Sequence, residues 1–414
     1  MAARVRHDTL SVMRTYTELF AIREFRVLFV TRCLAVASMS VASLALGTIT
    51  YAETGSAVLT ALSLFGGPLI TLLGSATLLG ASDMLRPRTA LLLLAGASLV
   101  ADALQAVPGL PWQLRFLILT IPYVVLSATA GAMLRLLSQI VGEHGFVLGR
   151  ATLNVAVGTC QIVGFSAGGL LLVAFTAREL FAVAAVVDLV LVVTIWLGIG
   201  DHPGARSGEG LVRRTRVVNR QLLASPVTRP LYLCLWVPNG LIVGCEALFV
   251  PFTDHAGLLF AAMAAGMPAG DVGVGRFASQ ELRDRLLEPL RLLLAAPWLL
   301  LFLAPPLPVV LVIAFCSAIG YAASLPLQDR LLRVTGEQTR GQTFGLALNG
   351  MKIGHAGGAL LGGLLATWVS TSTAMGLLAV ASLAVTLAVT RGLRRSAPGR
   401  RQQEVSLVPV AQLT

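Results

Sequence analysis

The sequence contains few charged residues. Only 12% of its 414 residues are Asp, Glu, Lys or Arg, about half the share found in soluble domains. Aromatic residues make up 6% of the chain and apolar residues 56%, and only one of the 31 basic residues, Lys352, is a lysine. The net charge of +11 would suggest a nucleic-acid partner if the arginines lay on one soluble face. They lie between apolar segments instead, so we expect a bilayer environment and no nucleic acid.

The sequence also lacks the motifs of common enzymes and metal sites. Its five cysteines all lie in apolar stretches, without the spacing of a zinc site or a redox pair. A phosphate-binding P-loop needs Ser or Thr after GxxxxGK, whereas the only lysine precedes Ile353. Neither GxSxG nor HExxH occurs. We expect no enzyme activity, no cofactor, no metal and no ATP-binding module.

Long apolar segments alternate with short polar loops. A membrane-spanning helix needs about 20 apolar residues, and we predict twelve such helices at residues 27–51, 56–80, 89–107, 113–141, 150–174, 179–199, 230–253, 257–279, 288–304, 307–330, 341–368 and 373–391. The first is too long for a signal-peptide core, so we expect it to be retained. The long polar connection 200–229 separates two sets of six. The sequence therefore predicts an all-α polytopic membrane protein with six-helix bundles at 27–199 and 230–391 and polar ends at 1–26 and 392–414.

The arginines predict the orientation of these helices. Of the 30 arginines, 26 lie in the ends and loops of one side, at 1–26, 81–88, 142–150, 200–229, 276–291, 330–340 and 391–414. The opposite loops hold only Arg115 and Arg178. Cytoplasmic loops carry the excess of basic residues in membrane proteins. We expect both termini to be cytoplasmic, in a bacterial cytoplasmic membrane.

The two halves contain similar segments. The fourth predicted helix ends with RLLSQIVGE at residues 135–143, and the tenth with RLLRVTGE at 330–337. Each is followed by a glycine-rich helix, with GFSAGG at 164–169 and GALLGG at 358–363. Similar segments six helices apart predict two halves built alike, related by an axis along the membrane normal.

Several segments resemble the major facilitator superfamily, in particular its bacterial drug and natural-product exporters. They are REFRVLFVTR at 23–32, GASDMLRPR at 80–88, GFSAGG, and RGQTFGLALNGM at 340–351. In the family, the loop after helix 2 reads GxxxDRxGRR; here Asp83 and Arg88 match it, while Met84 and Arg86 do not. Phe165 stands where the antiporter signature of helix 5 has proline. The resemblance implies a monomeric transporter working by alternating access, which exports a small amphipathic molecule in exchange for protons.

Both motifs have a physical interpretation. Asp83 and Arg88 would form a gate, in which Asp83 meets the positive end of helix 11 near 341–343; otherwise Asp83 is a solvated loop charge. The motif glycines would let helices approach closely or else contact substrate. These glycines are Gly164, Gly168, Gly169, Gly358 and Gly362.

Ionisable groups at membrane depth are functional candidates by default because they are costly to bury. The candidates for proton or substrate binding are Glu246, Lys352, His355, Asp271, Arg135 and Arg32. Lys352 should lie roughly 17 Å from the cytoplasmic end of helix 11, with His355 on the same face. It would bind a proton, pair with Glu246 or Asp271, or extend along a wet cavity wall.

The other candidates also have more than one interpretation. Glu246, on a helix that lines the central cavity in the family, would bind a proton or a cationic substrate. Arg135 would attract an anion or clamp a cytoplasmic gate, and Arg32 would reach the lipid headgroups or the cavity. Asp188 is expected to form a structural hydrogen bond, and Asp102 to lie at the interface.

Three alternatives to proton-coupled export remain open at this point. The first is an importer or facilitator on the same fold. The second is a membrane scaffold or sensor that does not transport, because both signature motifs are altered. The third is an enzyme embedded in the membrane, for which no catalytic pattern is visible.

Overall fold

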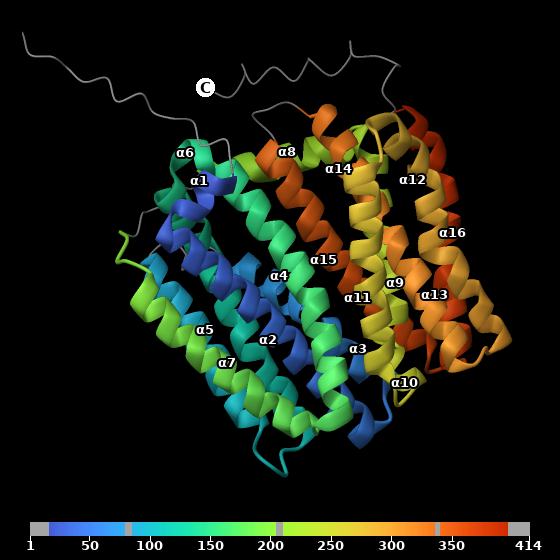
Figure 1. Ribbon diagram of the computed structural model, residues 1–414, viewed down its shortest axis with the longest axis horizontal. Coiled ribbons are helices and arrows are strands. Elements are labelled where there is room, and N and C mark those ends of the chain that lie inside the picture. Colours follow the sequence, from blue (N-terminus) through green and yellow to red (C-terminus); the bar gives the residue numbers. More distant parts are fainter. Residues whose placement is uncertain (1–15, 79–84, 204–209, 336–339, 396–414) are drawn as a thin grey trace, which may run out of the picture.

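The structure is a computed structural model, and it describes residues 16–78, 85–203, 210–335 and 340–395. Within these ranges every regular element is helical. Figure 1 shows α2, α5 and α7 on one side of the molecule and α12, α13 and α16 on the other, with α8 crossing one end. This arrangement separates the N-terminal half of the chain from the C-terminal half.

The N-terminal half begins with a short helix and contains six spanning segments. Its helices are α1 (Tyr16–Ala21), α2 (Arg23–Thr54), α3 (Ala57–Phe65), α4 (Gly67–Leu78), α5 (Pro87–Gln105), α6 (Trp112–Ala174) and α7 (Ala177–Gly198). Gly55 ends α2 in the left-handed conformation (φ 62°), and its N–H donates to the carbonyl of Tyr51, a common way to satisfy the last carbonyls of a helix. The predicted segment 56–80 is divided into α3 and α4 at Gly66.

One connection differs from the sequence-based expectation. We expected residues 142–150 to be a loop between two helices, but the two helices, which α6 includes, meet directly at a kink at Gly142, and the second begins before the predicted residue 150. Only Gly142, at φ 66° and ψ 178°, departs from helical geometry. Glycine tolerates this positive φ without the steric cost that a Cβ would add, so a single residue replaces the predicted loop.

The C-terminal half follows a helix, α8 (Gly210–Ala224), that lies in the predicted linker. Its elements are α9 (Thr228–Ala247), α10 (Phe249–Phe252), α11 (Ala256–Val272), the π-helical turn η2 (Gly273–Phe277), α12 (Gln280–Ala295), the 3-10 helix η3 (Ala296–Leu303), α13 (Leu307–Gly320), η4 (Tyr321–Ala323), α14 (Ser324–Arg333), α15 (Arg340–Leu365) and α16 (Thr371–Arg395). Several predicted segments are thus built from two or three consecutive helices.

Among the described residues, nine helices are long and apolar enough to cross a membrane. Each coincides with a predicted segment. The three remaining predicted segments correspond to the α3–α4 pair, the part of α6 after Gly142, and the glycine-rich α15. The chain is an all-α polytopic membrane protein.

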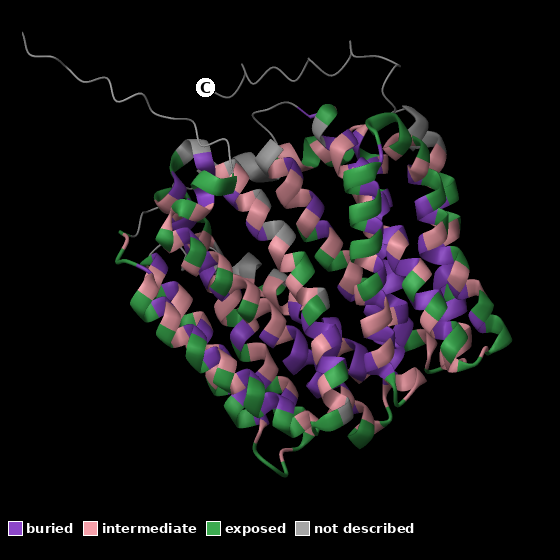
Figure 2. Ribbon diagram, in the orientation of Figure 1, coloured by how far each residue is buried: buried purple, intermediate pink, exposed green. Residues whose placement is uncertain are grey.

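The two halves share an apolar core at one end only. In the described part of the chain, one cluster combines side chains of both halves, including Phe65 and Phe165 with Phe249 and Phe260. Three other clusters draw on a single half each. Figure 2 shows the buried residues densest at the end of the molecule where α10 lies. This end carries the arginine-poor loops, so the structure is closed on the predicted outer side.

The motif glycines account for close helix contacts within each half. A Cβ on Gly164 would lie 2.7 Å from the carbonyl oxygen of Ala37 in α2, and a Cβ on Gly358 would lie 1.8 Å from the carbonyl oxygen of Gly240 in α9. Gly168 and Gly362 continue these contacts along α2 and α9. The two repeated motifs therefore occupy equivalent positions in their bundles.

The last glycine of each motif makes a contact between the halves. Gly169 in α6 lies against Gly257 in α11, and Gly363 in α15 lies against Val58 in α3. Backbones without side chains between them can approach closely enough for dense packing in a membrane. The outer closure thus rests on two equivalent helix crossings.

Candidate functional site

One cation of each half lies near the other. Arg32 of α2 lies close enough to Lys352 of α15 for the two charges to repel each other. Lys352 in turn acts on His355, one turn further along α15. Lys352 is exposed, whereas Arg32 and His355 are half-buried. The ammonium group of Lys352 is therefore accessible at the surface of α15, twelve residues after the helix begins.

No acidic group balances these cations within the described residues. None of the ion pairs there includes Arg32 or Lys352. The Nε of Arg32 and the Nε2 of His355 are buried and have no hydrogen-bond partner. Buried polar groups are normally paired, so this arrangement has both the charge and the free donors to receive an anion.

Arg150 extends the positive lining along α6. Its guanidinium lies 3.2 Å from the position that a Cβ on Gly345 of α15 would occupy. No ion pair within the described residues includes Arg150. Two arginines of the N-terminal half, Arg32 and Arg150, thus lie near α15 at different positions along its length.

Glu246 lies away from this cluster, inside the C-terminal bundle. Its Oε1 accepts a hydrogen bond of 2.8 Å from the hydroxyl of Tyr321. Lys352 is not among its partners, so the ion pair considered as an alternative for these two residues is absent from this conformation. The carboxyl group of Glu246 is held by a neutral donor.

Arg291 is buried beside this pair and was misplaced by the sequence analysis, which counted it among the loop arginines. It is 1% exposed. Its Nη1 donates to Oδ1 of Asn239 (2.8 Å), and its Nε donates to Sγ of Cys234 (3.2 Å). The arginine begins in α12 near the cytoplasmic side, but its long side chain reaches into the bundle, which charge counting along the sequence cannot detect.

The remaining candidates occupy separate places. Asp271 is exposed near the end of α11. Arg135 donates to the carbonyl of Leu85 at 3.5 Å, and Arg88 donates to the carbonyl of Trp196 at 2.5 Å. Asp83, the acidic residue of the proposed gate, lies outside the described residues.

Direct contacts close the outer end of the space between the bundles. The rings of Phe165 and Phe260 stack with centroids 5.4 Å apart, and Ser166 Oγ donates to the carbonyl of Phe260 at 3.1 Å. Tyr51 Oη donates to the carbonyl of Pro251 at 3.4 Å. The cation cluster therefore lies on the inner side of a packed barrier.

No protein-family model and no curated protein sequence matches this chain. Solved structures do match it. A POT family transporter in complex with a thioalcohol-conjugated peptide is 12% identical, with a TM-score of 0.68, over 91% of this chain and 97% of that one. The nucleoside transporter NupG is 12% identical, with a TM-score of 0.66, over 89% and 99%. The xylose transporter XylE from E. coli, in an inward-open conformation, is 12% identical, with a TM-score of 0.64, over 91% and 96%.

The chain shares the fold of these three proteins, each of which is a transporter. At this level of identity the likeness extends to the fold, while substrate and direction must be argued from this chain's own residues.

The structure brings together one pair of residues that the sequence analysis kept apart. Asp102 of α5 was expected at the interface and Asp188 of α7 was treated as structural. They are 9% and 2% exposed, and their carboxyl groups lie within hydrogen-bonding reach of each other. No local sequence signal links them, because contact between residues 86 positions apart depends on how α5 and α7 are rotated.

Proposed function

We propose that this chain is a secondary active transporter that works by alternating access and exports a small amphipathic organic molecule in exchange for protons. The proposal is supported by the proximity of Arg32 and Lys352, one from each half, which is close enough for an electrostatic interaction, and by the contacts that join the two halves at the end with the arginine-poor loops. A movement of one bundle relative to the other changes the separation of the two cations. It would therefore change the affinity for an anion held between them, which is what coupling to a conformational change requires.

We further propose that the substrate carries an anionic group. An anion between Arg32 and Lys352 would relieve their mutual repulsion and give the unpartnered donor of Arg32 an acceptor. A hydrogen bond to a charged group contributes about 1.5–3 kcal/mol. The apolar remainder of the substrate would suit a chain in which 56% of the residues are apolar.

Glu246 supplies the C-terminal bundle with an ionisable carboxyl group for proton exchange. The exporter-like motifs support outward transport, and the arginine distribution supports cytoplasmic termini in a bacterial cytoplasmic membrane. We propose a monomeric carrier, because each half of the chain supplies one wall of the site.

Binding measurements with matched probes test the proposed site. The purified protein should bind salicylate and p-toluenesulfonate more tightly than salicylamide and p-toluenesulfonamide, which have similar shapes but no charge. The variants Arg32→Gln and Lys352→Gln should each weaken binding of the anions by about 10- to 100-fold, following the energy of a charged hydrogen bond. Binding of the neutral amides should not change. Equal affinity for the charged and neutral members of both pairs would contradict an anion site.

The direction of transport needs a separate measurement. In inverted vesicles an exporter takes up substrate when the lumen is acidic, and each substrate molecule that enters releases protons from the lumen. An importer or facilitator on the same fold would give the opposite coupling or none. Absence of flux for every probe, together with intact folding, would favour the scaffold or sensor alternative.

A further inference from the structure

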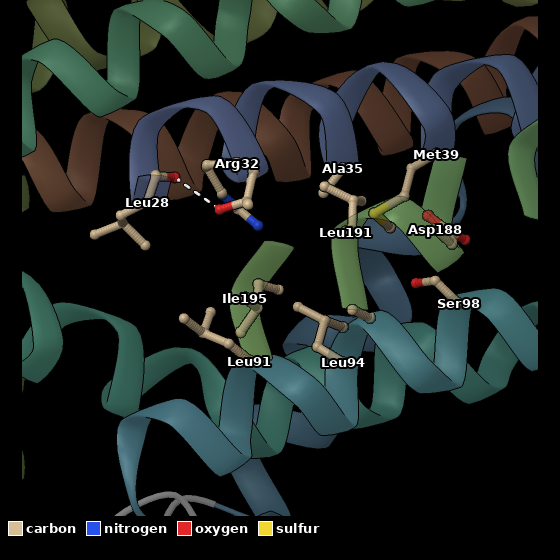
Figure 3. Close-up of a pocket in the computed structure, with 12 residues that line it drawn as sticks. Leu28, Arg32, Ala35, Met39, Leu91, Leu94, Ser98, Asp188, Leu191 and Ile195 are labelled. Carbon is tan, nitrogen blue, oxygen red and sulfur yellow. Dashed lines mark hydrogen bonds between the residues drawn. The ribbon is translucent and has the colours of Figure 1, made fainter. Parts of the chain in front are cut away.

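A small cavity lies inside the N-terminal bundle, and Arg32 is one of its lining residues. It is enclosed by α2, α5 and α7 and has a volume of about 30 Å³, enough for about two water molecules. Figure 3 shows Asp188, Ser98 and Met39 together at one end, and Arg32 and Leu28 toward the other. The lining side chains thus run from the middle of α7 toward the end of the bundle that carries the arginine-rich loops.

Asp188 is the polar residue that this cavity leaves unsatisfied. Its side chain is 2% exposed, it lines the cavity, and its Oδ2 has no hydrogen-bond partner. Buried carboxylate oxygens without a partner are rare because removing them from water is costly. A water molecule or a proton at this oxygen would satisfy it.

The other neighbours of Asp188 are a second carboxyl group and a hydroxyl group. Asp102 and Ser38 both lie within hydrogen-bonding reach of it. Two carboxylate groups cannot hydrogen-bond to each other unless one carries a proton, since an ionised carboxylate only accepts. A direct hydrogen bond between Asp102 and Asp188 would therefore require a shared proton.

No cation neutralises the pair within the described residues. From α6, Tyr123 lies near Asp102 and its hydroxyl is within reach of Ser43. Arg115, also from α6, is engaged by the carbonyl and Oε1 of Gln105 and lies 3.9 Å from Glu53 of α2. Arg32 of α2 lies at the other end of the cavity, and Arg178 and Glu179 lie at the start of α7. Because no salt bridge is available, protonation of one carboxyl group is what lowers the free-energy cost of burying the pair.

We propose that Asp102 and Asp188 form a proton-binding site within the N-terminal bundle, and that the adjoining cavity is its hydrated access route. The pair takes one proton from hydronium, so that one O–H bond of the hydronium ion breaks as one O–H bond forms on a carboxyl group and a water molecule is left. The reverse transfer to water releases the proton. The role of this proton in driving transport rests on the function proposed above, whereas the existence of the site does not.

Infrared difference spectroscopy on the purified full-length protein in lipid nanodiscs tests the site without any substrate. Between acidic and alkaline buffer, the wild type should show a protonated-carboxyl band. Asp102→Asn and Asp188→Asn should each remove or shift the part of that band due to the shared proton. Asp271→Asn, which changes an exposed aspartate in α11, should leave the band unchanged. An identical band in the wild type and both pair variants would overturn the proposal.

Filling the cavity tests the access route. Ala35 lines the cavity, and Ala35→Leu would occupy much of its volume without touching an ionisable group. Hydrogen–deuterium exchange of the carboxyl band should slow at least ten-fold in this variant while the band itself remains. An unchanged exchange rate would remove the cavity from the proposal.

Transport assays then separate this inference from the proposed function. With salicylate in proteoliposomes, Asp188→Asn should retain exchange at equal pH but lose at least nine-tenths of the acceleration given by a pH gradient. Full acceleration in Asp188→Asn would overturn the role of the pair in coupling. If the wild type exchanges none of the anionic probes, the proposed function fails, and the infrared result still decides whether the pair binds a proton.

Discussion

A Cβ added to Gly169 would lie 2.3 Å from Cα of Gly257, and one added to Gly257 would lie 2.1 Å from the carbonyl oxygen of Gly169. The two residues belong to different bundles and bring the backbones of α6 and α11 into contact. Atoms of neighbouring backbones cannot be compressed to such distances, so an added methyl group forces the helices apart. The closed outer end depends on the absence of both side chains.

Gly169→Ala should therefore shift the protein toward a conformation that is open on the outer side and lower transport at least ten-fold. Distances between spin labels on the outer loops of the two halves, measured by pulsed electron resonance, report the shift. Gly158→Ala is the matched control, because it lies on the same helix and no heavy atom would come within 4 Å of its Cβ. Equal distance distributions in the two variants would contradict the proposed role of this crossing.

Gly358→Ala should destabilise the C-terminal bundle. Its added Cβ would overlap the carbonyl oxygen of Gly240, and overpacking of this kind costs about 1–3 kcal/mol. Gly357→Ala adds the same group one residue earlier, where nothing lies within 4 Å. In detergent, the melting temperature should fall for Gly358→Ala and stay close to the wild-type value for Gly357→Ala. Similar melting temperatures would show that α9 and α15 can separate at little cost.

Glu246→Gln should reduce proton-driven transport while leaving substrate exchange at equal pH nearly intact. The substitution removes the ionisable group but keeps an oxygen that can accept from Tyr321, whose hydroxyl lies 2.8 Å from Glu246. Tyr321→Phe removes that donor and keeps the carboxyl group, so it should change the pH dependence of transport without abolishing it. Rates measured across a series of internal and external pH values distinguish the two effects. Full proton dependence in Glu246→Gln would exclude Glu246 as the sole carrier and leave the Asp102–Asp188 pair.

Asp284→Asn should destabilise the end of the C-terminal half that carries the arginine-rich loops. Asp284 Oδ1 accepts a 2.8 Å hydrogen bond from Nε of Arg330, and the two side chains are 18% and 8% exposed. Removing one member of a buried pair costs about 3–5 kcal/mol, and the partial exposure of Asp284 favours the lower end of that range. The reduction can be measured as a lower melting temperature.

Glu281→Gln is the control for this experiment. It breaks the 2.6 Å contact between Glu281 and Arg285, whose side chains are 77% and 75% exposed, respectively. Exposed pairs contribute about 0–1 kcal/mol, so the melting temperature should change little. Equal effects of the two substitutions would show that burial of the Arg330 pair adds no stability.

The apolar segments predicted the all-α membrane fold because this signal arises locally. Hydrocarbon thickness fixes the length of a spanning helix, whereas the orientation inferred from the arginine-rich loops stays a prediction. The glycine repeats also predicted close packing, and the structure places Gly164 against α2 and Gly358 against α9. The break at Gly66 and the direct joining of two helices at Gly142 were missed, because apolar content does not report where a helix bends.

Only part of the candidate site could be predicted from the sequence. The spacing of Lys352 and His355 placed them on one face of a helix, since three residues make nearly one turn. The approach of Arg32 to Lys352, and of Asp102 to Asp188, depends on the rotation of separate helices and has no local pattern. The same holds for Tyr321 and Glu246, which lie 75 positions apart. Contacts between side chains of different helices can be identified only from the three-dimensional structure.

The kink in α6 has a geometric consequence. Gly142 is the residue with non-helical torsions between Trp112 and Ala174, so its φ and ψ set the angle at which the fourth and fifth crossings meet. A residue with a Cβ would resist the φ of 66° at this position, so the angle between the two crossings depends on glycine.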